Sequence, residues 1–302
     1  MRYIHILIVV GVILNLYQCR YSILQLSDTS LNIFIGLLTD LHHYIQQLIN
    51  SSSKVIVTCN TANNIYHNYN LSEYENKCPE HRYDVQIISR RPLIIYIENF
   101  LTSNEIQYLI QLANPFFENS TVANYDGSRT LDESFRLSST TYLQRAGTPI
   151  IKCIEKRFAK FQGNINPLQI EPLQVVKYQS NQFFHPHFDW FYNGSHLDNG
   201  GQRITTFFTY LFANCTNGET EFIEIKYNQT LHERFCKILI CDDVAEQYGL
   251  RFRPIPGNSI FWFNVDENNN NDELTLHAGR PPSENGFKIG LNTWTRHSIF
   301  HN

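Results

Sequence analysis

The chain has 302 residues, of which 42% are hydrophobic and 14% aromatic. This composition can bury the core of one large or two modest domains, which excludes general disorder of the main body. The formal net charge of −4 comes without a dense basic run, so the sequence gives no electrostatic support for a nucleic-acid partner.

Residues 1–20 have the pattern of a secretory signal. Arg2 precedes an apolar run from Ile4 to Leu16, and polar residues follow. A helix that spans a bilayer needs about 20 apolar residues, so the shorter run favours a signal-peptide core. The residues near Cys19 make a poor cleavage site, so a signal anchor with residues 4–16 in the membrane stays open as the alternative.

Glycosylation sequons indicate the same compartment. One Asn-x-Ser/Thr triplet is weak evidence, but several together with a signal-like start favour passage through the endoplasmic reticulum. We therefore expect a protein of the endoplasmic reticulum lumen or secretory pathway, either secreted or anchored as a type II membrane protein. The sequons start at Asn50, Asn70, Asn119, Asn193, Asn214 and Asn228.

The seven cysteines also fit an oxidising compartment. Cys59–Cys78 and Cys236–Cys241 are the candidate disulfides, because each would close a short loop. Cys153 lies on the apolar face of an expected helix, so we predict that it is a buried thiol.

Helices are expected in the first half of the chain. For residues 21–84 we predict a helical segment, with periodic apolar residues over 22–53, followed by a loop closed by a disulfide. The main domain, 85–302, begins with a strand over 92–97. A Thr102–Glu105 capping box then predicts a helix that stops at Asn114-Pro115, and Thr148 with Pro149 predicts a second helix that Gly163 closes.

The second half of the chain is predicted to form strands. Helices followed by a run of strands predict an α+β fold that is mainly β, a sandwich or barrel with helical support and a core over 170–297. The strands are expected over Leu173–Tyr178, Arg203–Phe212, Arg251–Pro254, Ser259–Val265 and Lys288–Arg296.

His187, Asp189 and His277 are the candidate metal ligands. In an extended backbone, residues i and i+2 project to one side, so His187 and Asp189 can reach one ion while Phe188 points into the core. His277 follows 88 positions after Asp189 (277 − 189). Two imidazoles and one carboxylate leave three octahedral positions open, which suits iron(II) that must bind a bidentate 2-oxo acid and dioxygen.

Lys288 is the candidate anchor for the co-substrate, 11 positions after His277 (288 − 277). A buried ammonium is costly unless it is paired, and the far end of a dicarboxylate would provide that pair. We expect Tyr178 and Thr206, on strands taken to be neighbours, to donate hydroxyl hydrogen bonds to the same carboxylate.

Two other interpretations stay open. His185, His187 and Asp189 also form a His-x-His-x-Asp pattern, which would suit a zinc hydrolase, although Trp190 stands where such enzymes place another histidine. The second is a catalytically silent fold used for binding or scaffolding. An isolated His-x-Asp is common by chance, and a lysine that opens a strand is ordinarily a solvated edge residue.

The motifs together resemble the catalytic core of prolyl 4-hydroxylases. Leu173–Tyr178 and Pro186–Asp189 are similar to the start of that core, and the similarity covers about Val85–Arg296. Further matching motifs are Arg136–Ser139, Gln202–Thr206, Gly218–Phe222, Gly257–Trp262, Leu276–Gly279 and Lys288–Arg296.

The resemblance implies a double-stranded β-helix (jelly-roll) dioxygenase that uses iron(II), 2-oxoglutarate, dioxygen and ascorbate. Its substrate would be a proline-containing peptide or protein, and its products hydroxyproline, succinate and CO2. His187, Asp189 and His277 would hold the iron. Lys288 would bind the C5 carboxylate of 2-oxoglutarate, with Tyr178 and Thr206 assisting. Paired cysteines such as Cys236 and Cys241 resemble the fungal-type branch of the family.

Three features depart from the family pattern. The spacing from His277 to Lys288 is one residue longer than usual, with the enlarged loop at Glu284–Gly286. Phe184 stands where relatives often carry a tyrosine near the substrate. The chain also has no counterpart of the long amino-terminal peptide-binding region of animal collagen hydroxylases, so a collagen preference is not implied.

Overall fold

The computed structural model describes residues 72–301, apart from 125, 127, 193 and 244–247. The predicted signal segment, the helix expected over 22–53 and Cys59 lie outside the described residues. Among the helices that the structure describes, none is both long and apolar enough to cross a membrane.

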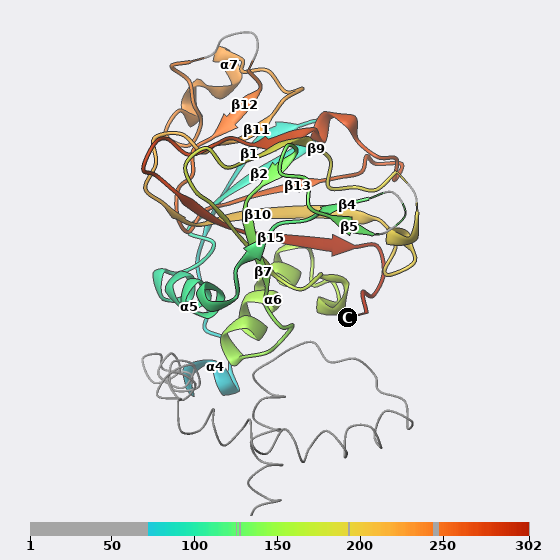
Figure 1. Cartoon of the computed structure of the whole chain (residues 1–302). Coiled ribbons are helices and arrows are strands. Elements are labelled where there is room, and N and C mark those ends of the chain that lie inside the picture. The colour runs from blue at the N-terminus through green and yellow to red at the C-terminus, as the bar shows by residue number, and fades with distance from the viewer. Residues whose placement is uncertain (1–71, 125, 127, 193, 244–247, 302) are drawn as a thin grey trace, which may run out of the picture. The chain divides into compact units, whose positions relative to one another are not determined.

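Two antiparallel sheets face each other and form the body of the protein (Figure 1). Side chains from both sheets meet between them, such as Trp262 and Phe222 with ring centroids 5.2 Å apart. The eight-stranded sheet has the order β1 (Asp84–Arg90), β2 (Leu93–Glu98), β13 (Ser259–Phe263), β10 (Arg203–Ala213), β15 (Lys288–Arg296), β8 (Gln174–Tyr178), β7 (Ser139–Tyr142) and β3 (Glu118–Asn119).

The second sheet is smaller. Its five strands are short, and the neighbouring strands come from distant parts of the chain. Their order is β12 (Leu250–Phe252), β11 (Thr220–Phe222), β14 (His277–Gly279), β9 (Phe183–His187) and β6 (Arg136–Leu137); β4 (Val122–Ala123) and β5 (Arg129–Thr130) form a separate ribbon. The two facing sheets make the jelly roll predicted from the resemblance.

Helices α5 (Ser103–Ala113) and α6 (Pro149–Phe161) cover the outer face of the large sheet (Figure 1). Side chains alternate across a strand, so Phe207 of β10 packs against Phe158 of α6 while Phe208 faces the other sheet. The other α-helices of the described residues are short: α4 (Ser72–Asn76) and α7 (Gln229–His232).

Both helix starts are confirmed. Thr102 and Glu105 form a complete capping box at α5, and Thr148 caps α6 with Pro149 at its first position. The six predicted strands are also present, as β2, β8, β10, β12, β13 and β15. The short strands β9, β11 and β14 were not predicted, because three to five residues give too little alternation to identify a strand.

One disulfide prediction is confirmed and one is wrong. Cys236 and Cys241 are bonded as predicted. The predicted Cys59–Cys78 bond is wrong, because Cys78 is bonded to Cys153, 75 positions away in sequence and with 5.3 Å between the Cα atoms. Cys153 is therefore not the free thiol that was predicted. The prediction relied on loop length, whereas the packing of the chain around α6 sets this pairing. Cys215 is the free cysteine of the described chain.

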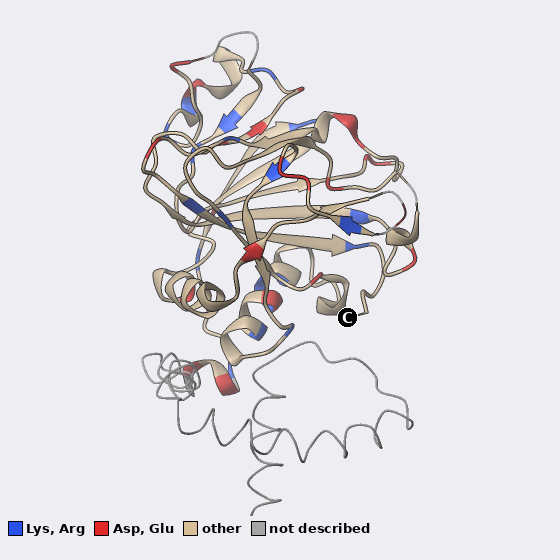
Figure 2. Cartoon of the chain, in the orientation of Figure 1, with Lys and Arg blue, Asp and Glu red and all other residues tan. Residues whose placement is uncertain are grey.

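Lys and Arg are interspersed with Asp and Glu over the strands, helices and loops of the described chain (Figure 2). Some charged side chains are buried in the fold, and they include Asp189, Glu221 and Lys288.

Candidate active site

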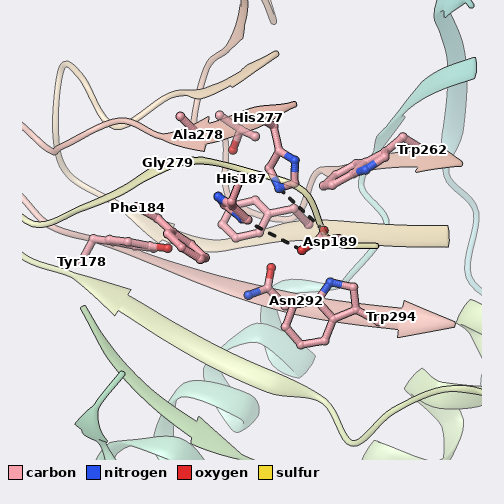
Figure 3. Close-up of a pocket in the computed structure, with 12 residues that line it drawn as sticks. Tyr178, Phe184, His187, Asp189, Trp262, His277, Ala278, Gly279, Asn292 and Trp294 are labelled. Carbon is pink, nitrogen blue, oxygen red and sulfur yellow. Dashed lines mark ion pairs between the residues drawn. The ribbon is translucent and has the colours of Figure 1, made fainter. Parts of the chain in front are cut away.

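Sheet register brings His187, Asp189 and His277 together (Figure 3). β9 pairs antiparallel with β14, and His187 lies directly opposite His277. Asp189 follows two residues after His187. One potential ligand atom from each of the three side chains lies within 4.8 Å of the others, and no other such group occurs in the described chain. The expected convergence of these residues on one point is therefore present.

Backbone carbonyls fix the orientation of both imidazoles. Nδ1 of His187 lies 2.8 Å from the carbonyl of His185, and Nδ1 of His277 lies 2.9 Å from the carbonyl of Thr275. A carbonyl only accepts, so each Nδ1 carries the proton and each Nε2 presents its lone pair. These Nε2 atoms face the Asp189 carboxylate at 4.0 and 3.6 Å. Burial lowers the pKa of His187 to about 3, which keeps it neutral.

A buried hydrogen-bond chain holds the carboxylate of Asp189. Thr206 Oγ1 donates to Asp189 Oδ2 over 2.8 Å, and Asn264 Nδ2 donates to Thr206 Oγ1 over 2.9 Å. Trp262 Nε1 in turn donates to Asn264 Oδ1 over 2.9 Å. Burial alone would raise the pKa of Asp189, but His277, His187 and the Thr206 hydrogen bond hold it below its usual value.

The structure corrects the position of Thr206. Its strand β10 is not a neighbour of β8, which carries Tyr178, because β15 lies between them. Along β15, Thr206 also does not lie beside Lys288. Thr206 pairs with Trp294, six positions along β15 from Lys288 (294 − 288). At about 3.3 Å per residue, six positions span roughly 20 Å along the strand. Thr206 therefore contacts the Asp189 carboxylate and is too far from Lys288 to bind the same carboxylate of a ligand.

Lys288 lies fully buried at the start of β15, opposite Tyr178 of β8. Its ammonium donates to the carbonyls of Gly218 and Arg280 over 2.7 and 3.1 Å. It also lies 4.7 Å from the ring centroid of Tyr178. An ammonium has three donors, so one is left for a ligand. Burial lowers the pKa of Lys288 to about 8, although Cys215 and Glu219 partly offset it.

A pocket beside the three candidate ligands is lined by them and by Tyr178, Thr220, Asn292 and Trp294 (Figure 3), and Tyr178 is the lining residue that contacts Lys288. Trp294 is 5% exposed, and its indole N–H has no hydrogen-bond partner among the described residues. A buried donor without a partner is costly, so this N–H fits a pocket built to receive a polar ligand.

Thr220 is a pocket residue that the sequence prediction missed. The hydroxyl of Tyr210 donates to Thr220 Oγ1 over 2.8 Å, which leaves the Thr220 hydroxyl hydrogen free to reach the pocket. Its place in the Gly218–Phe222 motif was the available signal. A threonine in a three-residue strand shows no alternation, so sequence alone gave no reason to prefer it over Thr206.

Two phenylalanines flank the candidate ligands. Phe184 stacks on the His187 ring, with Arg136 lying 4.5 Å from the Phe184 centroid. The prediction that Phe188 points into the core is wrong. β9 ends at His187, so strand alternation no longer applies, and partly exposed Phe188 stacks on Trp190 at 4.4 Å.

Comparison with known proteins identifies the family. The model of the 2OG-Fe(II) oxygenase superfamily matches residues 173–296. Probable prolyl 4-hydroxylase 10 of Arabidopsis thaliana is 35% identical over 213 residues, which are 70% of this chain and 71% of that protein. Prolyl 4-hydroxylase 5 of the same plant is 32% identical, over 72% of this chain and 71% of that protein.

A solved structure is also similar. The viral collagen prolyl hydroxylase of Paramecium Bursaria Chlorella virus-1, in its 2OG complex, aligns with a TM-score of 0.47 and 23% identity, over 67% of this chain and 95% of that chain. The family match favours neither the zinc-hydrolase nor the silent-module interpretation. The chain belongs to the prolyl 4-hydroxylase family of 2-oxoglutarate- and iron(II)-dependent dioxygenases.

Proposed function

We propose that this dioxygenase hydroxylates prolyl residues of a peptide or protein, with iron(II) held by His187, Asp189 and His277. The observation that carries the proposal is the convergence of these three side chains, with both Nε2 atoms aimed at one carboxylate. Two neutral imidazoles and an ionised carboxylate are the donor set of non-haem iron(II) oxygenases. The site therefore fits the metal that the family uses.

The anchor for 2-oxoglutarate is Lys288, with Tyr178 and Thr220 completing the binding site. The one free donor of the ammonium and the hydroxyls of Thr220 and Tyr178 are the polar groups that we assign to the C5 carboxylate. This assignment replaces Thr206 by Thr220 and gives Thr206 a different role, which is to orient Asp189.

Bound iron(II) would supply the redox chemistry that couples 2-oxoglutarate decarboxylation to insertion of oxygen into a proline C–H bond. In the balanced reaction, one dioxygen contributes one atom to hydroxyproline and one to succinate, and CO2 leaves. The protein's own part is placement. Asp189 and the two imidazoles fix the metal position, Lys288 fixes the co-acid, and Trp294 offers an indole N–H inside the pocket.

The compartment and the reductant belong to the same proposal. Two disulfides, Cys78–Cys153 and Cys236–Cys241, favour the endoplasmic reticulum or another oxidising compartment. The sequon asparagines Asn119, Asn214 and Asn228 are exposed, as glycosylation requires. Ascorbate as reductant is typical of the family. Anchoring through residues 4–16 stays a prediction.

The test is coupled turnover. Purified protein is incubated with iron(II), 2-oxoglutarate, ascorbate and proline-rich peptides, and mass spectrometry measures succinate and peptide oxidation. We expect equal amounts of both, abolished in Asp189→Ala and retained in Asp198→Ala, an exposed acid outside the site. Undiminished turnover in Asp189→Ala would refute the ligand assignment. Iron binding without turnover on any peptide would favour a silent binding module.

A further inference from the structure

An ion pair between a fully buried carboxylate and a partly exposed arginine lies beside the pocket but outside the proposed machinery. Glu221 of β11 has no exposed surface, and its Oε2 accepts a hydrogen bond from Arg280 Nε. Its Oε1 accepts from the backbone N–H of Gly249 over 2.6 Å. Both oxygens of this carboxylate are thus used by protein donors. Glu221 is next to Thr220 in the strand and points to the opposite face, so it does not line the pocket.

The same two chain segments hold the ammonium of Lys288. Of the two carbonyls that accept from Lys288, one belongs to Gly218, at the turn before β11. The other belongs to Arg280 itself, directly after β14. The backbone N–H of Arg280 also donates to the carbonyl of Glu219 over 2.9 Å. Arg280 is therefore held to the β11 segment by its backbone and its side chain, and its carbonyl is presented to Lys288.

Close packing leaves the ammonium little choice of position. Gly218 has φ +100, and a Cβ there would lie 3.3 Å from Lys288 Cδ and 3.1 Å from Cys215 Sγ. The Gly218 carbonyl is thus fixed by the backbone conformation of the turn. The enlarged loop that leads to Lys288 follows Arg280 in the chain. On that side of Arg280, the hydrogen bond between its side chain and Glu221 is the contact that restrains its carbonyl.

We propose that Glu221 and Arg280 are positioning residues that set the location of the Lys288 ammonium, and through it the affinity for 2-oxoglutarate. The inference rests on the proposed role of Lys288 as the anchor. The Arg280 side chain is 37% exposed, so without the Glu221 charge it gains more by turning toward water. The Arg280 carbonyl then shifts, and the third ammonium donor no longer points at the co-substrate carboxylate.

The experiment compares Glu221→Gln and Arg280→Met with wild-type enzyme. The dissociation constant of 2-oxoglutarate is measured anaerobically on iron-loaded protein, and KM values are measured in turnover. We expect both variants to weaken 2-oxoglutarate binding about tenfold, the effect of one misplaced charge-assisted hydrogen bond. The KM for peptide and the affinity for iron should stay within about twofold. Arg280→Lys, which keeps the charge, should recover part of the loss.

A second buried ion pair provides the matched control. Glu105 and Arg157 join α5 to α6 with bonds of 2.7 and 2.8 Å, and neither residue lines the pocket. Glu105→Gln should lower the melting temperature without changing the dissociation constant of 2-oxoglutarate.

If Glu221→Gln and Arg280→Met behave like this control, their role is structural and the proposal is overturned. Lys288→Ala separates the two claims. If it leaves 2-oxoglutarate binding unchanged, the anchor itself is misassigned. If it abolishes binding while the Glu221 and Arg280 variants bind normally, only the positioning role fails.

Discussion

At the scale of single residues, the site depends on a chain of hydrogen bonds in which each donor faces toward Asp189. Trp262 and Asn264 donate in turn toward Thr206, which then has its own hydrogen available for Asp189. Groups that orient a metal ligand are often as important as the ligand, because they fix its geometry and its charge. Thr206 is therefore the residue through which the core of the large sheet acts on the metal.

Replacing Thr206 by Val keeps the shape of the side chain and removes the donor to Asp189. We expect iron(II) affinity to fall about ten- to a hundredfold, as for other groups that orient metal ligands. Metal titration measures the effect. The control is Thr205→Val, because the Thr205 hydroxyl is also buried but donates to Gln162 Oε1 over 2.6 Å, on the other face of the sheet. Equal affinities in the two variants would contradict the role given to Thr206.

The pH dependence of co-substrate binding follows from Lys288. Its pKa of about 8 means that the ammonium loses its proton above that pH in the enzyme without ligand. The KM for 2-oxoglutarate should therefore rise as pH increases through about 8, and Lys288→Arg should move this rise to higher pH. A KM that stays constant to pH 9.5 in the wild type, at about 1.5 pH units above this pKa, would contradict the assignment.

The lowered pKa of Lys288 also makes the stability of the fold depend on pH, and here the effect of raising the pH is favourable. Between about pH 8 and the ordinary lysine pKa, the unfolded chain binds a proton that the folded protein has released. Stability contributed by this group therefore rises with pH across that window, because the unfolded state holds more protons. Denaturation midpoints of wild type and Lys288→Met are measured at pH 8 and pH 10. The stability of the wild type relative to Lys288→Met should be higher at pH 10 than at pH 8.

At the scale of elements, the pairing of β10 with β15 builds the pocket wall. Phe208 of β10 lines the pocket, and its ring lies over Gly290 of β15. A Cβ on Gly290 would lie 2.3 Å from the Phe208 ring, so this position admits only glycine while Phe208 keeps its place. The absence of a side chain at one strand position thus decides where an aromatic ring of the neighbouring strand lies.

Gly290→Ala should displace Phe208 and lower the free energy of unfolding by about 1–3 kcal/mol, the usual cost of overpacking a core. Turnover should fall as well, because the displaced ring lines the pocket. Chemical denaturation measures the first effect. Adding Phe208→Leu to Gly290→Ala should restore part of the stability. A double variant no more stable than Gly290→Ala alone would show that the clash is not with Phe208.

Sequence was sufficient for the long elements and insufficient for the short ones. The capping box of α5, the Thr148-Pro149 start of α6 and apolar spacing located these two helices, and β-branched or aromatic runs located β2, β8, β10, β13 and β15 of the large sheet. In the smaller sheet only β12 was predicted, and β11 and β14, with three residues each, show too little alternation to be recognised. The three candidate ligands were found by residue type, whereas Thr220 needed the register that places it in the pocket.

At the scale of the whole molecule, two disulfides constrain the chain very differently. Cys78–Cys153 joins positions 75 apart, while Cys236–Cys241 joins positions 5 apart. The first pairing was missed because it depends on where the segment before β1 packs against α6. Loop length alone, the criterion available from sequence, favours nearby cysteines and excludes such a bond.

Removing each disulfide should reveal this difference. In the chain-entropy description, the long loop contributes roughly 4 kcal/mol and the short one roughly 2 kcal/mol to stability. Cys78→Ser with Cys153→Ser should therefore destabilise the protein about twice as much as Cys236→Ser with Cys241→Ser. Denaturant titration of both double variants measures the free energies. A larger loss for the short loop would contradict this ranking.

The most direct test of the account is anomalous diffraction at the iron edge. Crystals would be grown without oxygen, with iron(II) and 2-oxoglutarate bound. We predict one iron peak bonded to His187 Nε2, His277 Nε2 and the Asp189 carboxylate, with the far carboxylate of 2-oxoglutarate on Lys288 Nζ. An iron peak at any other place, or a co-substrate that does not touch Lys288, would contradict the account.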